Sequence, residues 1–262
     1  MRIYVLADFE GACGVVGEAG KTLTDSHQFD FARRMVTAEI NAAVEGALAA
    51  GATDIIINDA HGSGLNLIYD ELHPEARILL GSPRPRRMLG LDRDTDGVFL
   101  IAYHAMAGTV RGILSHSYSS IGIQNMWLNE VPIGEIGLDA ALAGSLGVPV
   151  LLVTSDKAGT EEAKAILGEA VRTVAVKEGI SRNAAISLHP AKAQALIRQA
   201  AEEAVRHAGE MSPLVFEPPY RLRREFKLES YADELMRRAV PTVTRLDSRT
   251  VVAVSENLFD LI

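Results

Sequence analysis

Short apolar runs that stop abruptly at polar residues recur along this chain. The clearest are Ile3–Ala7, Asp54–Ile57, Gly97–Tyr103 and Val150–Ser155. Runs of this kind, rich in β-branched and aromatic residues, are typical of strands that are buried on both faces of a parallel sheet. The pattern therefore predicts an α/β fold. In such sheets, ligands bind beyond the carboxyl ends of the strands.

Helical periodicity fills the stretches between these strands. A long helix is expected from Thr24 or Asp25 to Ala49, because apolar residues recur along one face and Gly51 follows. Shorter helices are expected from near Gly134 and over Gly159–Leu167. Alternation of strands with helices predicts βαβ units.

The remaining segments show weaker patterns. Leu65–Gly90, with a short strand near Ile78–Leu80 and a loop rich in Pro and Arg, is expected to be a solvated surface. From about residue 171 the pattern changes, so we expect an α/β domain over residues 1–170 and a smaller α+β domain over 171–262. The other expected elements are a hairpin of Gly122–Leu128 with Val131–Ile133, a helix at Pro190–His207, and strands at Thr173–Lys177, Arg221–Phe226 and Thr250–Val254.

Two carboxylates end the first strand. Asp8 and Glu10 project to the same side of an extended chain, whereas Phe9 points into the core. Like charges placed so close favour a bound cation. Taken alone, the same pattern also fits an Asp8 that caps a turn and a solvated Glu10. His61 and His104 follow two other buried runs and should reach the same edge, and such a mixture of carboxylates and imidazoles suits zinc or, less specifically, manganese or iron.

Composition narrows the classes of partner. The 262-residue chain carries a net charge of -8 and no extended basic cluster, since groups such as Arg84, Arg86 and Arg87 are short and expected at the surface. This argues against nucleic acid or a membrane and favours a small-molecule or peptide ligand. No secretory signal is recognisable in the first residues, so a cytoplasmic protein is expected. The single Cys13 excludes an intramolecular disulfide, and nothing specifically activates it as a nucleophile.

Five motifs, in order along the chain, resemble the DppA-type D-aminopeptidases, a family of zinc metallopeptidases. They are ADFEG, NDAHG, AYHA, LSHS and GEIGLDA. The resemblance implies that Asp8, Glu10, His61, His104 and Glu135 bind two Zn²⁺ ions per subunit, with Mn²⁺ or Co²⁺ as substitutes, and that His116 acts in catalysis. With five ligands for two ions, Asp8 is the natural bridge. VKxxISR (Val176–Arg182) and PAKA (Pro190–Ala193) also match, but Lys177 and Arg182 receive no physical role, and neither does Cys13.

The same resemblance implies a three-layer α/β/α catalytic domain, a smaller α+β domain and a homodecamer. The leading hypothesis is a binuclear zinc aminopeptidase that removes the N-terminal residue from short peptides or amino-acid amides, with D-residues implied by the family name alone. Two alternatives stay open: a metal-dependent amidase or phosphoesterase, and a metal-dependent peptide-binding protein without turnover.

Overall fold

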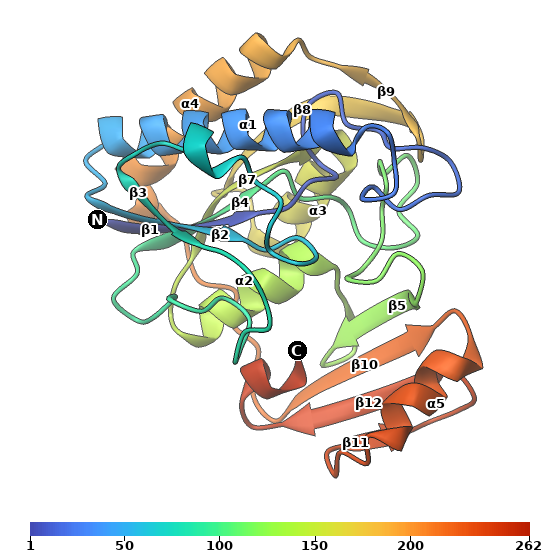
Figure 1. The fold of residues 1–262 in the computed structure, drawn as a ribbon. Coiled ribbons are helices and arrows are strands. Elements are labelled where there is room, and N and C mark those ends of the chain that lie inside the picture. Colours follow the sequence, from blue (N-terminus) through green and yellow to red (C-terminus); the bar gives the residue numbers. More distant parts are fainter.

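The computed structural model describes residues 1–262 and contains two β-sheets (Figure 1). The larger sheet has the strand order β3-β2-β1-β4-β7-β8-β9 and is parallel except for the pair β8 and β9. Its strands are β1 (Arg2–Ala7), β2 (Asp54–Asp59), β3 (Ala76–Leu79), β4 (Gly97–Ile101), β7 (Val150–Asp156), β8 (Arg172–Ser181) and β9 (Ala184–Ser187). The predicted parallel sheet is confirmed, although β9 was not predicted.

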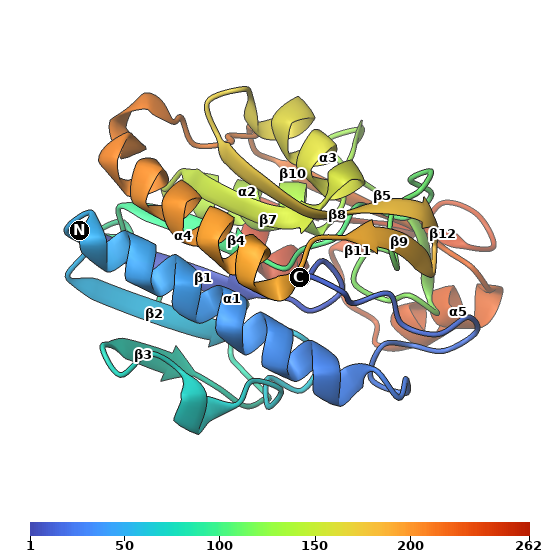
Figure 2. The same ribbon diagram turned by 90° about the horizontal axis from the view of Figure 1, so that it is seen from above.

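Helices cover both faces of this sheet. On one face α1 (Phe29–Ala49) lies beside α4 (Pro190–Arg206), as Figure 2 shows, and α2 (Glu135–Ser145) and α3 (Lys157–Leu167) lie on the other. Side chains of β1 alternate between the two cores: Ile3 and Val5 pack with α1 and α4, whereas Tyr4 and Leu6 pack with α2. The predicted α/β/α layering is confirmed. No helix combines the length and the low polarity that a membrane-spanning segment requires.

The smaller sheet is antiparallel and lies beyond α2, at the lower right of Figure 1. Its order is β11-β12-β10-β5-β6, and α5 (Glu229–Arg237) packs against it. The predicted β5–β6 hairpin turns at Asn129 and Glu130, which both have positive φ, 48° and 65°. The strands are β5 (Ile123–Leu128), β6 (Val131–Pro132), β10 (Tyr220–Phe226), β11 (Val243–Arg245) and β12 (Thr250–Ser255), and short 3₁₀ helices lie at Tyr69–Glu71, Ala208–Glu210 and Leu258–Leu261.

Each of the two sheets draws elements from both sides of residue 170. β8, β9 and α4 follow this point in the chain but belong with the larger sheet, and β5 and β6 precede it but belong to the smaller one. The two sheets therefore do not coincide with residues 1–170 and 171–262. The division of the chain into two domains at that point stays a prediction.

The first helix begins later than expected, at Phe29 rather than at Thr24 or Asp25. Side chains around these residues stabilise turns instead: Thr22 Oγ1 donates to Asp25 at 2.5 Å, and Glu18 accepts from the backbone N–H of His27 at 2.6 Å. A local side-chain partner competes with helix formation, so the first helical turn is not formed here.

Candidate metal centre

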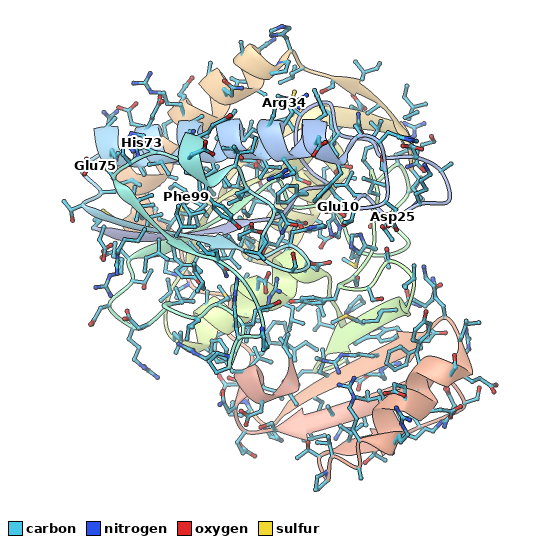
Figure 3. All side chains as sticks on the ribbon, in the orientation of Figure 1. Glu10, Asp25, Arg34, His73, Glu75 and Phe99 are labelled. Carbon is cyan, nitrogen blue, oxygen red and sulfur yellow. The ribbon has the colours of Figure 1, made fainter.

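The predicted ligands meet at the carboxyl ends of adjacent strands. Asp8 and Glu10 follow β1, His61 follows β2, His104 follows β4, and Glu135 begins α2. Because β2, β1 and β4 are parallel neighbours, their ends share one edge of the sheet. Figure 3 labels Glu10 at this edge, whereas His73 and Glu75 lie at the opposite end of the sheet.

Short distances join these side chains into one cluster. Nε2 of His104 lies 3.4 Å from Oδ2 of Asp8 and 3.2 Å from Oε1 of Glu135. Nε2 of His61 lies 3.5 Å from Oε1 of Glu10. Ligand atoms of Asp8, Glu10 and His104 all lie within 4.8 Å of one another. The structure thus brings the five residues together, as expected.

Close backbone packing explains how the loops after β1 and β4 are held. The N–H of Gly11 donates to the carbonyl of Ala102 at 2.8 Å. A Cβ at position 11 would lie 1.7 Å from the carbonyl oxygen of Tyr103, so only glycine fits. Ala102 itself has a φ of 60°, and its N–H donates to Thr154 Oγ1 at 2.8 Å. This left-handed residue redirects the chain and delivers His104 into the cluster.

Unpartnered buried atoms show what the cluster lacks. Asp8 Oδ2, Glu10 Oε2, His61 Nδ1 and His104 Nε2 have no hydrogen-bond partner. Nδ1 of His104 lies 3.0 Å from the carbonyl of Ala105, and donation there leaves a lone pair on Nε2, aimed at carboxylate oxygens. A divalent cation would give a partner to the atoms of Asp8, Glu10 and His104, and the backbone partner on Nδ1 of His104 is usual for a metal-bound histidine. In His61 the nitrogen that faces the cluster is Nε2. The residues therefore fit a zinc-type metal.

The pKa shifts of the clustered carboxylates and imidazoles also favour a bound metal ion. Burial, and then the charge of Glu10, raise the pKa of Asp8 well above its ordinary value. Burial opposes the charged form of His61, but Glu10 and other carboxylates outweigh it and raise the pKa of His61 to about 9. Burial likewise opposes charge on Glu135, and His104 outweighs it, which lowers the pKa of Glu135 to about 2. Protons on the imidazoles compensate the carboxylates here, and a metal ion would replace those protons.

His116 lies against the cluster. Its ring stacks on that of His104 at 4.0 Å between centroids, and its Nε2 lies 3.7 Å from Oε1 of Glu135. Burial, and then the charge of His104, lower its pKa below the ordinary value, which favours the neutral ring. Since His104, His116 and Glu135 also form a second group of ligand atoms within 4.8 Å of one another, geometry alone leaves His116 either role, ligand or catalytic group.

Comparison with known proteins indicates the family of this chain. The family model described as D-aminopeptidase matches residues 1–262. A D-aminopeptidase of Bacillus subtilis (strain 168) is 36% identical over 224 residues, which are 84% of this chain and 79% of that protein. The structure of the Zn-dependent D-aminopeptidase DppA from Bacillus subtilis, described as a self-compartmentalizing protease, matches with a TM-score of 0.89 and 31% identity, and covers 99% of this chain and 93% of that one.

The chain belongs to the D-aminopeptidase family. This finding confirms the resemblance that the motifs indicated, and the likeness to DppA covers both sheets of the fold.

In this D-aminopeptidase family member, the cluster opens into a cavity of about 410 Å³. Arg87, Tyr103 and Tyr118 line it together with the candidate ligands. The expectation that Arg87 belongs to a solvated surface is wrong: its guanidinium donates to both carboxylate oxygens of the buried Asp139, at 2.5 and 2.6 Å. Tyr103 and Tyr118 donate to the same carboxylate. Asp139, a carboxylate within the GEIGLDA motif, was the sequence signal that could have predicted a buried cationic partner such as Arg87.

Lys177 supports the cluster from β8. It is buried, and its ammonium donates to the carbonyls of Glu10, Ala12 and Val15 at 2.6, 2.7 and 2.5 Å. Three charge-assisted bonds fix the loop that carries Glu10. Cys13 of the same loop is also buried, which raises the pKa of its thiol, and Sγ donates to the carbonyl of Leu188 at 3.0 Å. A structural role for this cysteine follows.

Proposed function

We propose that this member of the D-aminopeptidase family is a binuclear zinc aminopeptidase that removes the N-terminal residue from short peptides, with D-residues preferred. The observation that carries the proposal is the set of unpartnered buried carboxylate and imidazole atoms that converge beside a cavity of about 410 Å³. Metallo-aminopeptidase activity agrees with the family and with the Zn-dependent relative DppA.

In this proposal the metal ligands are Asp8, Glu10, His61, His104 and Glu135, with Asp8 as the bridge between two ions. When bound, such a pair of ions supplies an activated water, polarises the scissile carbonyl and anchors the substrate amine. The protein fixes the donor positions in advance, because each ligand follows a buried strand or begins a helix.

The remaining chemistry is assigned to His116. Burial keeps its imidazole neutral, Nδ1 donates to the carbonyl of Leu114 at 2.8 Å, and Nε2 therefore presents a lone pair to the cluster. Nε2 would take up a proton from the attacking water, and the imidazolium so formed would donate a hydrogen bond to the oxyanion of the tetrahedral intermediate or pass that proton to the leaving amine. An unperturbed imidazole pKa of about 6.5 suits a group that must accept and release a proton near neutral pH.

Assays on a panel of substrates test the activity. The zinc-loaded protein should hydrolyse D-aminoacyl p-nitroanilides and D-alanyl dipeptides faster than their L-counterparts, and should leave aryl phosphates intact. Faster cleavage of aryl phosphates would support the phosphoesterase alternative. Peptide binding without turnover would support the non-catalytic alternative.

Metal analysis tests the site separately from activity. Elemental analysis should find close to two divalent ions per wild-type chain, and Mn²⁺ or Co²⁺ should restore activity to the chelated protein. Asp8→Ala should lose both ions because Asp8 is the proposed bridge, and Glu10→Ala should weaken mainly one. An unchanged metal content in Asp8→Ala would contradict this assignment.

We also propose a homo-oligomer, a decamer by analogy with the family. Support comes from the relative DppA, which is described as a self-compartmentalizing protease. Light scattering at micromolar concentration should report a mass several times that of the 28.2 kDa chain. A monomer would count directly against assembly.

A further inference from the structure

A second cavity, of about 840 Å³, lies beside the metal cavity. The two cavities share the lining residues Thr22, His116, Ser120 and Ile121. His116 therefore stands at their boundary, with the metal cluster on one side and this groove on the other. A substrate held at the cluster can continue past His116 into the groove.

The groove is basic although the chain as a whole is acidic. Its lining includes four cationic side chains and a single carboxylate, namely Lys21, Arg111, Arg182, Lys227 and Asp25. The chain carries a net charge of -8. Because most of its surface repels anions, a local excess of cations beside the active site marks a place where an anionic group is bound.

Two of these cations are held by backbone carbonyls and have no carboxylate partner. Arg182, in the turn between β8 and β9, donates Nη1 to the carbonyl of Ser115 at 2.5 Å. Lys227 donates Nζ to the carbonyl of Ser120 at 2.5 Å. Lys21, by contrast, is paired with Glu18 at 2.6 Å. Neutral carbonyls orient the charges of Arg182 and Lys227 but do not neutralise them.

Arg182 keeps most of its donor capacity. Only Nη1 has a protein partner, so Nε and Nη2 are free to bind a ligand. A guanidinium presents such donors in a planar fork that matches a carboxylate. Its anchor, the carbonyl of Ser115, belongs to the residue directly before His116, so the guanidinium is held on the loop that carries His116.

The direction of the substrate follows from the proposed role of His116. A group that protonates the leaving amine must lie on the leaving side of the scissile bond, so the peptide beyond that bond enters the groove. Each further residue adds at most about 3.5 Å of extended chain. In a dipeptide or tripeptide, the C-terminal carboxylate therefore lies within one or two residue lengths of the scissile bond, on the side of the basic groove.

We propose that this groove binds the C-terminal carboxylate of the substrate, with Arg182 as the principal donor, and that the protein thereby selects short peptides with a free C-terminus. The inference rests on the proposed aminopeptidase function and names its substrate class. Arg182 is thus a specificity-determining residue, and the charge of Lys227 supports it.

The test compares two substrates that differ only at the C-terminus: a D-alanyl dipeptide with a free carboxylate and the same dipeptide as its amide. For the wild-type protein, kcat/KM should be about ten- to a hundredfold higher for the free acid, the scale of a hydrogen-bonded charge pair. Arg182→Ala should reduce this ratio to near one, mainly through KM of the acid. Arg182→Lys should restore part of it, because the charge returns without the fork.

Arg93→Ala is the matched control, since Arg93 is exposed and lies outside both cavities. It should keep the wild-type ratio. Equal rates for acid and amide in the wild-type protein would overturn the proposal, and so would a ratio that survives Arg182→Ala. If neither dipeptide is cleaved, the aminopeptidase function fails, and the carboxylate site is tested separately by calorimetric binding of the two dipeptides. Tighter binding of the acid that is lost in Arg182→Ala supports the carboxylate site. Equal binding of acid and amide overturns it.

Discussion

Lys177→Met is the most informative single substitution outside the ligand set. Methionine is similar in length and fits a buried site, but it removes the three hydrogen bonds to the carbonyls of Glu10, Ala12 and Val15. The first of these carbonyls belongs to the proposed ligand Glu10, and the other two belong to the loop that follows it. The variant therefore asks whether the loop is stable without its central cation.

The expected magnitude follows from opposing contributions. The buried carbonyls of Glu10 and Val15 would be left without a partner, at about 1–3 kcal/mol each. The carbonyl of Ala12 keeps the N–H of Val15 at 3.2 Å and loses only the bond to the ammonium, about 1.5–3 kcal/mol, so the total is about 3–9 kcal/mol. Removing a buried ammonium recovers several kcal/mol of desolvation, the same cause that lowers the pKa of Lys177 to about 8. A net loss of about 3 kcal/mol is expected. In a domain of this size that lowers Tm by about 6–12 °C.

Thermal unfolding and zinc titration, measured on the same preparations, check both consequences. Zinc affinity should fall about tenfold, because the backbone of the ligand Glu10 loses its support. Lys157→Met is the control: Lys157 is exposed and pairs with Glu178 at 3.0 Å, so its loss should hardly move Tm. If Lys177→Met unfolds within about 2 °C of the wild-type protein and binds zinc equally well, the proposed support of the loop is wrong.

Two further substitutions probe catalysis and pH dependence. His116→Ala should keep its metal and its assembly but lose about two to four orders of magnitude in kcat; loss of metal would make His116 a ligand, and unchanged kcat would exclude both catalytic roles. Burial raises the pKa of Glu39 from 4.5 to about 7, so the unfolded chain ionises first and this group costs stability as pH rises through that window. Glu39→Gln should therefore gain stability over wild type between pH 4.5 and 7, by up to about 3 kcal/mol, and urea unfolding that shows a constant difference would refute this.

The strand-end residues could be predicted because their signal is local. Asp8 and Glu10 follow a buried run, and neighbouring buried runs are followed by His61 and His104. Because parallel strands share a carboxyl edge, this pattern predicts that the four side chains meet in a metal site. The sheet that delivers them follows from the same runs. The edge strand β9 and the helix α5, which packs on the smaller sheet, escaped prediction because both are short, so their stability comes from pairing and packing rather than from their own pattern.

Arg87 shows a different limit. In sequence it stands in a loop with Arg84 and Arg86, a composition typical of a solvated segment. Only the folded chain brings it to Asp139, 52 residues away, where two tyrosine hydroxyls complete the buried pair. A buried arginine needs a partner, and the partner lies on another element. Nothing in the local sequence distinguishes Arg87 from Arg84 and Arg86, which are only half-buried.

Lys177 and Arg182 belong to a motif whose role could not be derived from the sequence but is visible in the structure. Two strands, β4 and β7, separate β8 from β1 in the sheet, yet Lys177 reaches the loop of Glu10 and Arg182 reaches the residue before His116. Because Lys177 lies in the strand and Arg182 in the turn that follows, one segment supports the metal-binding loop and the loop of His116 together. Their roles depend on backbone carbonyls more than 60 residues away, which no pattern of side chains in the sequence records. A change in the β8–β9 hairpin should therefore alter zinc affinity and substrate selection at once, although no proposed metal ligand lies on it.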